Sequence, residues 1–320
     1  MRFGIWAPRG GKADEQVEDE CQFAIDVIQC AERHGFDVTL IAQRFLGVDL
    51  DAWVLASAMA TVTNKIELLV ALHPGIITPQ VTAKMGATLD RMSRGRFSIN
   101  LVNGWWREEF DIYGNGSWID RSEERYHRMD EFLQVLQGLW THERFSFDGK
   151  YFQMQDGYCP TKPIQQPFPP IYAASHAEQG MDIIAQRCQN KFVPYEIGFR
   201  NYERNFDLIS RQIDDMNARR ARFGKTYPMG YCISTNVICR ETQAEAEAIA
   251  DGIEAGGYDK KSGGTAVKGL GTGLVGTPEF IADRIRRYED IGITTLMLRF
   301  PKMLEGIEDF GRKVIPLVNH

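Results

Sequence analysis

Apolar and polar positions follow two alternating patterns along the whole chain. Short apolar runs typical of buried strands alternate with amphipathic stretches typical of helices. The strand candidates are residues 2–7, 36–42, 65–72, 96–102, 169–174, 190–195, 229–239 and 293–300. The helix candidates are 15–34, 50–62, 78–92, 121–141, 176–188, 200–222, 243–254 and 277–291, with a last helix near 304–317. This alternation predicts an α/β fold and favours a (β/α)8 TIM barrel over a doubly wound sheet. We expect the barrel to be one domain over residues 1–320.

Two segments depart from the even spacing of strands and helices. Residues 103–168 hold an extra loop, a long helix and a predicted hairpin whose turn is Asp148 and Gly149. Residues 255–273 are rich in Gly and Lys and have no core pattern. We expect both to be insertions at the barrel rim, and we expect residues 256–273 to be a mobile lid.

Polar and aromatic residues crowd the end of the fourth predicted strand. They are Asn100, Asn103, Trp105, Trp106 and Arg107. In (β/α)8 barrels the carboxyl ends of the strands carry the active site. Neighbouring side chains on a strand point to opposite faces, so the two tryptophans cannot both face one core. The pattern therefore predicts an active site at this strand end.

Composition excludes several classes of protein. The net charge of −6 is spread along the chain without a basic stripe, which argues against a nucleic-acid partner. No apolar run approaches the roughly 18 residues of a membrane span, and the start resembles a strand more than a signal peptide, so we expect a cytoplasmic protein. The cysteines form no CxxC pair and the histidines no HxH or HxxxH pair, so we expect no metal site. The sequence also lacks the GxSxG motif of α/β-hydrolases, so catalysis by side chains alone has little support. We therefore expect an enzyme that uses a cofactor.

GTGLVG at residues 271–276 matches the GxGxxG pattern of dinucleotide-binding proteins. A true fingerprint follows a strand and opens a βαβ unit, whereas this segment trails a loop near the end of the chain. Thr277 and Pro278 fit an N-cap and a first helical position. The segment therefore predicts a helix start and not a nicotinamide site.

Several segments, taken in order, resemble the bacterial luciferase-like flavin monooxygenases. Within residues 36–136 they are FDVTLI, DAWVLASAMATVTNKIELLVALHPG, ATLDRMSRGRFSINLVNGW and SEERY, followed by PIQQPFPPIYAASH, ICRET and LVGTPEFIADRI. The branch of alkanesulfonate, dimethyl sulfone and pyrimidine monooxygenases is the most similar. The resemblance implies a (β/α)8 barrel that uses reduced FMN, supplied by a separate NAD(P)H-dependent flavin reductase, with O2 and a small-molecule substrate. Relatives assemble as homodimers or homotetramers, which we expect here too.

The resemblance also assigns cofactor-binding positions. Ala71, His73, Asn100 and Val102 would lie beside the flavin ring, while Tyr126, Ser175 and His176 would bind the phosphate at a helix opening at residue 176. Asn100 would donate a hydrogen bond to the flavin or to the oxygen that reacts there. Alternatively, its side chain would hydrogen-bond to irregular backbone at the strand end. His73 is equally compatible with a surface role. AASH stands where many relatives have GGSS, which predicts a weaker phosphate site.

Substrate positions differ from those of the alkanesulfonate branch. Ser234, Asn236 and Asp49 stand where that branch has Arg, His and Cys, and Phe300 stands where it has a Tyr. We assign Asn100, Trp105 and Arg299 to catalysis, and assign substrate binding to Arg44, Trp106, Asn236, Lys268 and Phe300. The expected function is two-component FMN-dependent oxygenation of a small organosulfur compound, a sulfone or an alkanesulfonate. The alternatives are a pyrimidine-ring-opening monooxygenase and a flavin or deazaflavin oxidoreductase without oxygenase activity.

Overall fold

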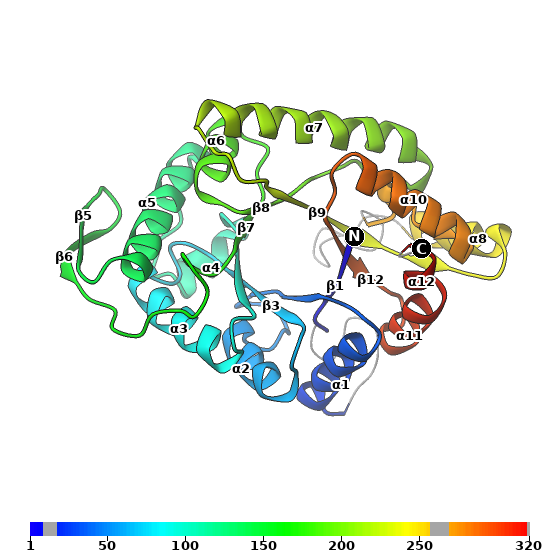
Figure 1. Ribbon diagram of the computed structural model, residues 1–320, viewed down its shortest axis with the longest axis horizontal. Coiled ribbons are helices and arrows are strands. Elements are labelled where there is room, and N and C mark those ends of the chain that lie inside the picture. Colours follow the sequence, from blue (N-terminus) through cyan, green and yellow to red (C-terminus); the bar gives the residue numbers. More distant parts are fainter. Residues whose placement is uncertain (9–17, 257–268, 319–320) are drawn as a thin grey trace. The chain divides into compact units, whose positions relative to one another are not determined.

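A computed structural model describes residues 1–8, 18–256 and 269–318. Its central feature is a closed barrel of eight parallel strands in the order β1-β12-β9-β8-β7-β4-β3-β2 (Figure 1). The barrel strands are β1 (Arg2–Trp6), β2 (Val38–Ile41), β3 (Glu67–Leu72), β4 (Phe97–Leu101), β7 (Ile171–Ala173), β8 (Asn190–Phe192), β9 (Gly230–Asn236) and β12 (Thr295–Arg299). Strands that are neighbours in the barrel are also consecutive barrel strands along the chain, which confirms the predicted (β/α)8 fold.

Helices follow the strands as the amphipathic pattern predicts. They are α1 (Glu20–Arg33), α2 (Ala52–Val62), α3 (Pro79–Met92), α4 (Arg107–Ile112), α5 (Ser122–Thr141), α6 (Glu178–Arg187), α7 (Tyr202–Arg222), α8 (Gln243–Ala255), α10 (Pro278–Asp290), α11 (Met303–Lys313) and α12 (Ile315–Val318), with single turns at η1 (Phe199–Asn201) and η2 (Leu270–Thr272). The side chain of Thr277 caps α10 and Pro278 is its first residue, so GTGLVG leads into a helix start as predicted. None of the described helices is long and apolar enough to cross a membrane.

Residue contacts divide the chain into two compact units, residues 1–39 with 191–320, and residues 40–190. In the first unit, α11 packs through aromatic rings on β1 and on the segment that follows α1. The ring of Phe310 lies 5.4 Å from Phe3, 6.0 Å from Phe36 and 5.8 Å from Phe300, measured between centroids. Phe300, which we predicted at the substrate site, therefore packs in the core between β12 and α11. The Phe300 ring, buried against Phe36 and Phe310, stabilises the fold and offers little surface to a substrate.

In the second unit, β4 pairs with β3 on one side and β7 on the other, which places Asn100 opposite both Ala71 and Tyr172. The fully buried Asp90 on α3 accepts hydrogen bonds from the backbone N–H groups of Ile164 and Gln165 at 2.6 and 3.0 Å. This carboxylate anchors the segment that leads into β7. The expected insertion at 103–168 contains α4, α5 and an outer hairpin beyond α5 in Figure 1.

Four local predictions were wrong. The hairpin of β5 (Phe145–Asp148) and β6 (Gln153–Gly157) pairs Asp148 with Gln153, so its loop is residues 149–152, closed by the Gly149 N–H to Phe152 O bond of 3.0 Å. The predicted strand 229–239 breaks after β9, and β10 (Ile238–Cys239) pairs instead with β11 (Val275–Gly276). The last helix splits before Pro316, whose ring is incompatible with a helix interior. Helix α6 begins at Glu178 and not at residue 176.

Most of the predicted lid, residues 257–268 with Lys268, lies outside the described residues. The described remainder of that loop is buried at Leu270, Gly271 and Thr272. Strands of both compact units belong to the closed barrel. The prediction of one domain over 1–320 stays a prediction.

Candidate active site

Two asparagine side chains at the carboxyl end of β4 have unused hydrogen-bonding capacity. Asn100 is only 8% exposed, and no described residue provides a partner for its side-chain amide. The side-chain oxygen of Asn103 is buried and also lacks a partner within the described part of the chain. Buried polar groups in folded proteins are nearly always satisfied. This strand end is therefore suited to a polar ligand that would complete both amides.

His73, at the end of β3, is buried at 3% exposure and contacts two backbone oxygens. Its Nδ1 lies 3.0 Å from Val102 O and its Nε2 lies 3.2 Å from Gln43 O. A neutral imidazole has one N–H, so it can donate to only one of these oxygens at a time. The ring links the segment after β2 to the end of β4, and it brings together His73 and Val102, two of the four residues predicted beside the flavin ring. A surface role for His73 is excluded.

Ser175 and Tyr126, both predicted at the phosphate site, are in direct contact. The Ser175 hydroxyl donates to the phenolic oxygen of Tyr126 at 2.8 Å and accepts the N–H of Ala177, the N-cap of α6, at 3.0 Å. This leaves the Tyr126 O–H group available to donate elsewhere. The first amides of α6 lack intrahelical acceptors, and a helix N-terminus favours an anion. Two hydroxyls and a helix N-terminus thus form an anion cradle, beside which the His176 side chain is exposed.

Gly180, in the first turn of α6, is a site residue that the sequence patterns did not identify. A Cβ at this position would lie 2.2 Å from the Ser175 Oγ atom and 2.5 Å from a ring carbon of Tyr126. Only glycine therefore allows the helix to approach the two hydroxyls this closely. A glycine inside a helical turn, where it lowers helix propensity, was the signal that could have found it.

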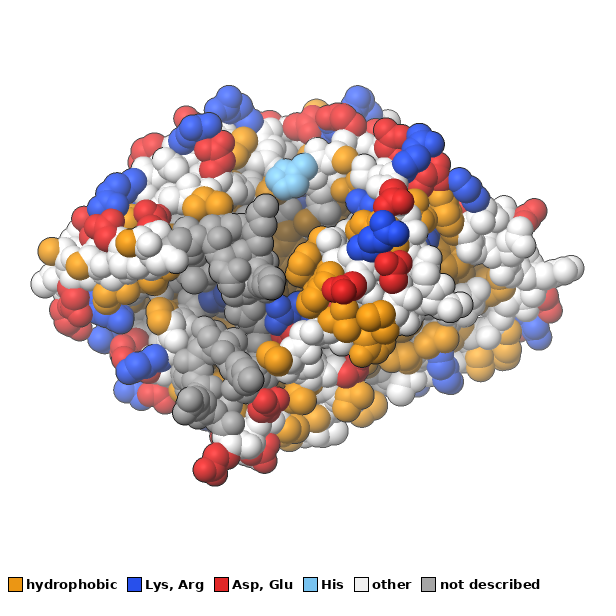
Figure 2. Space-filling model, turned by 180° about the vertical axis from the view of Figure 1, so that it is seen from behind, with side chains coloured by type: hydrophobic (Ala, Val, Ile, Leu, Met, Phe, Trp, Pro, Cys, Tyr) orange, Lys and Arg blue, Asp and Glu red, His pale blue; other side chains and the backbone are white. Residues whose placement is uncertain are grey.

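Trp105 and Trp106 follow β4 outside any strand, so neither ring enters the barrel core. Their rings stack with centroids 5.6 Å apart, and Trp105 is 56% exposed. Trp106 is the N-cap residue of α4, whose C-terminal residue Ile112 is also exposed. Hydrophobic side chains are visible at the surface on the face drawn in Figure 2. The two tryptophans are placed to contact a ligand or to cover it.

Arg299 and Asn236 end neighbouring strands of the first unit, in register with each other. The Arg299 guanidinium lies 3.7 Å from the centroid of the Trp6 ring, and the Trp6 Nε1–H donates to the Ser234 hydroxyl at 2.9 Å. A cation over an indole face is a favourable contact that keeps the charge at the strand end.

Tyr195, just after β8, adds a group that sequence reasoning missed. Its hydroxyl donates to the backbone oxygen of Ser234. Burial raises the pKa of Tyr195, and the nearby Arg299 partly opposes that rise. The phenol therefore stays protonated and holds the end of β9. The missed signal was an aromatic residue directly after a short strand.

Arg44, predicted to bind substrate, is paired with Asp49. The Arg44 Nη2 and Asp49 Oδ2 atoms are 2.5 Å apart, and a second bond of 2.6 Å joins Nε to the same oxygen. Asp49 is the residue that the resemblance sets opposite the cysteine of the alkanesulfonate branch. The pair neutralises Arg44, so this arginine is not a free cation for an anionic substrate.

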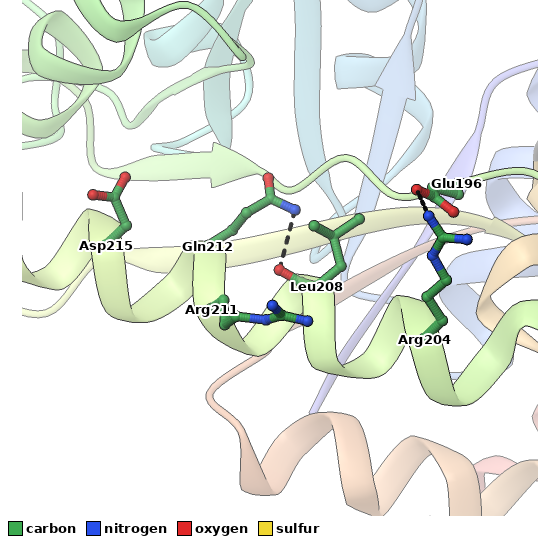
Figure 3. A pocket seen from close by; sticks show the side chains of 6 residues that line it. All are labelled: Glu196, Arg204, Leu208, Arg211, Gln212 and Asp215. Atoms are coloured by element: carbon green, nitrogen blue, oxygen red, sulfur yellow. Dashed lines mark hydrogen bonds and ion pairs between the residues drawn. The ribbon is translucent and has the colours of Figure 1, made fainter.

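A pocket of about 300 Å³ lies between α7 and the segment after β8 (Figure 3). Its polar side chains already have partners: Arg204 pairs with Glu196 at 2.9 Å, and Gln212 donates to Leu208 O at 3.3 Å and to Pro194 O at 2.8 Å. Side chains that already satisfy one another do not resemble an active site. The carboxyl ends of the strands remain the candidate site.

Comparison with known proteins agrees with this geometry. A family model described as luciferase-like monooxygenase matches residues 1–295. An FMNH2-dependent dimethylsulfone monooxygenase of Pseudomonas putida is 31% identical, over 99% of this chain and 95% of that protein. A pyrimidine monooxygenase of Acinetobacter baylyi is 28% identical, again over 99% and 95%. The solved structure of an EDTA monooxygenase from Chelativorans sp. BNC1 shares the fold, with a TM-score of 0.82 and 18% identity over 100% of this chain and 93% of that one. The chain belongs to the luciferase-like monooxygenase family.

Proposed function

We propose that this chain is a two-component FMN-dependent monooxygenase that oxygenates a small organosulfur compound, a sulfone or a short alkanesulfonate. The observation that carries the proposal is the 31% identity to a dimethylsulfone monooxygenase over 99% of the chain. The reaction inserts one oxygen atom of O2 at the carbon next to sulfur, and the other oxygen atom leaves as water. Cleavage of the C–S bond then releases an aldehyde, together with a sulfinate from a sulfone or sulfite from a sulfonate.

The residues of the second unit fit FMN. Ser175, Tyr126 and the first amides of α6 would hold the phosphate, because they offer O–H and N–H donors to an anion. The unsatisfied amides of Asn100 and Asn103 would meet polar atoms of the flavin ring or of the reacting oxygen. FMN bound in reduced form supplies the electrons that activate O2. The protein's part is to hold the cofactor, orient the substrate and exclude water.

The charges around the site favour a small neutral substrate. Arg44 is neutralised by Asp49, and the family's anion-handling positions are Ser234 and Asn236 in this chain. Arg299 over Trp6 and the stacked Trp105 and Trp106 offer one cation and flat apolar surfaces. A sulfone needs only hydrogen-bond donors to its oxygens, whereas a sulfonate needs a paired cation. We therefore rank sulfones above sulfonates.

Reduced FMN comes from a separate NAD(P)H-dependent flavin reductase. GTGLVG, the one segment that matches a dinucleotide pattern, leads into the capped start of α10, which supports the absence of a nicotinamide site. The isolated protein is therefore expected to bind reduced FMN more tightly than oxidised FMN and to show no steady NADH oxidation.

The test couples the protein to any FMN reductase and measures oxygen uptake and product release. The panel contains dimethyl sulfone, methanesulfonate, uracil and decanal. Sulfinate release from the sulfone supports the proposal, and activity on uracil alone supports the pyrimidine alternative, which the 28% identity to a pyrimidine monooxygenase keeps open. Binding of reduced FMN without any substrate-dependent oxygen consumption would indicate a flavoprotein that is not an oxygenase.

A further inference from the structure

Three side chains with metal-ligating chemistry converge between α1 and α11 in the first unit, and none of them is assigned to the flavin. They are Cys30 and His34 on or directly after α1, and Glu308 on α11. The thiol sulfur, an imidazole nitrogen and a carboxylate oxygen all lie within 4.8 Å of one another. We propose that these three side chains bind one Zn²⁺ ion, with water as the fourth ligand.

The local sequence explains why two of the ligands share one face. Cys30 and His34 are four positions apart at the end of α1, so they lie one above the other on the same side of the helix. Glu308 comes from the far end of the sequence, and α11 packs against α1 and, through Phe310, against the Phe36 ring that follows α1. The expectation of no metal site considered only pairs of histidines and pairs of cysteines, and a C-x3-H pair completed by a distant Glu falls outside it.

Gly311, one turn after Glu308, makes room for the imidazole. A Cβ at this position would lie 2.7 Å from the His34 Cβ and 3.1 Å from its Nδ1 atom. The missing side chain allows His34 to approach α11, the helix that also carries Glu308. Any larger residue would push the ring away from the carboxylate.

Burial and charge both suit a divalent soft-to-borderline ion. Cys30 is 1% exposed, His34 is intermediate, and the Glu308 side chain is 46% exposed, so an ion can enter from the solvent side and reach the thiol last. One thiolate and one carboxylate would balance the charge of Zn²⁺. Sulfur, imidazole nitrogen and carboxylate oxygen are its usual protein ligands, and they disfavour Mg²⁺ and Ca²⁺, which require oxygen.

Two arginines compete for the same groups and set the barrier to binding. Arg33 forms a hydrogen bond with the thiol, and Arg312 lies 3.7 Å from the Glu308 carboxylate. That distance is too long for a hydrogen bond, and exposed ion pairs contribute little. An ion that coordinates all three side chains would have to displace only the Arg33 contact with the thiol and the long Arg312–Glu308 contact.

The position of the site indicates a structural role. The C-terminal end of α1 leads directly into β2, so Cys30 and His34 lie at the amino-terminal end of the strands. In (β/α)8 barrels this end contributes to stability and the opposite end to chemistry. A bound ion would cross-link the first helix to α11, and monooxygenase activity should be independent of it.

The experiment uses the full-length protein without a histidine tag, freed of metal by chelation. Co²⁺ titration is expected to give one equivalent per chain, with intense tetrahedral d–d absorption and a thiolate-to-cobalt charge-transfer band, and Zn²⁺ should displace it. Saturating Zn²⁺ should raise the melting temperature, because an ion that binds only the folded state stabilises it.

Variants identify the ligands. Cys30→Ser should abolish the charge-transfer band, and His34→Gln and Glu308→Gln should each weaken binding at least about 100-fold, since even outer-shell partners of a metal contribute about 10- to 100-fold. The matched controls are Cys21→Ser at the exposed start of α1 and Glu305→Gln one turn earlier on α11. Glu308→Gln changes only a half-exposed side chain, so the folded protein can be tested whatever happens to the Cys30 variant. Binding that is absent, or equal in wild type and Glu308→Gln, would overturn the proposal.

Discussion

The hydroxyl of Ser175 donates to the phenolic oxygen of Tyr126 at 2.8 Å, and this bond joins the segment after β7 to helix α5. Tyr126 comes from the insertion between β4 and β7, whereas Ser175 comes from the barrel itself. The insertion therefore supplies half of the anion cradle. A chain that kept the barrel but lost α5 would keep the residues that we propose beside the flavin ring and lose Tyr126 from the proposed phosphate site.

Removing either hydroxyl should weaken FMN binding. Ser175→Ala and Tyr126→Phe are each expected to raise the Kd for FMN about 10- to 100-fold, the value of a hydrogen bond to a charged group. The double variant should lose less than the sum of the two, because the hydroxyls act as one bonded pair. Fluorescence titration of FMN measures all three, with Tyr227→Phe at a distant exposed tyrosine as the control. Unchanged affinity in both single variants would contradict the assignment of the cradle.

Gly180→Ala should also weaken FMN binding. The added methyl group would lie 2.2 Å from the Ser175 Oγ atom, so α6 or the two hydroxyls must move. Gly252→Ala is the matched control, since it also lies within a helix and a Cβ there has no atom within 4 Å. That control should gain about 0.5–1 kcal/mol of stability from helix propensity. Equal FMN affinity in the two variants would mean that α6 does not shape the site.

Asn100→Ala should lower turnover about 100-fold or more, the effect of losing one preorganised donor. Folding should change little, because no described residue bonds to the Asn100 amide. FMN affinity should also change little where the amide meets the reacting oxygen, whereas removing an amide bonded to the flavin ring would lower it. Steady-state assays with a coupled reductase and thermal unfolding separate the two roles. A variant that keeps its turnover but melts earlier would assign Asn100 to loose backbone at the strand end.

Long-range periodic patterns predicted the fold well, because each strand and helix buries a regular stripe of its own residues. The start of α10 was predicted from local signals, the N-cap residue Thr277 and the proline at position 278. The hairpin loop was mispredicted because Asp-Gly is a turn signal of two residues, whereas packing against α5 closes a loop of residues 149–152. Here tertiary contacts outweighed the dipeptide preference.

From the residue pattern alone, the sequence predicted only those site residues that directly follow a recognisable strand. Asn100, Val102 and the two tryptophans follow one strand, so their neighbourhood could be inferred. Arg44 and Asp49 lie in an irregular segment with no periodicity, so their pairing was invisible. Cys30 and Glu308 belong to opposite ends of the chain, and only the packing of α1 on α11 brings them together. Partners that depend on tertiary contact leave no local pattern.

Lys191, on β8, should make stability depend on pH. Its side chain is fully buried, its ammonium donates only a long bond of 3.4 Å to Phe192 O, and the nearest carboxylate, Asp215, is paired with Arg219 at 2.8 Å. Burial lowers the pKa of Lys191 from 10.5 to about 8, and Asp215 opposes that shift weakly. The unfolded chain thus holds this proton up to a higher pH than the folded one.

Between about pH 8 and 10.5 the unfolded state binds more protons at this position, so the free energy of unfolding should rise with pH across that window. Below pH 8 both states are protonated, and the folded state carries a constant cost of about 3 kcal/mol. Lys191→Met should remove the cost and the pH dependence together, which raises stability at pH 7 more than at pH 10. Urea unfolding at both pH values measures this, with Lys65→Met at an exposed lysine as the control. If Lys191→Met gained no more stability at pH 7 than at pH 10, the ammonium would have to be solvated or paired in the folded protein.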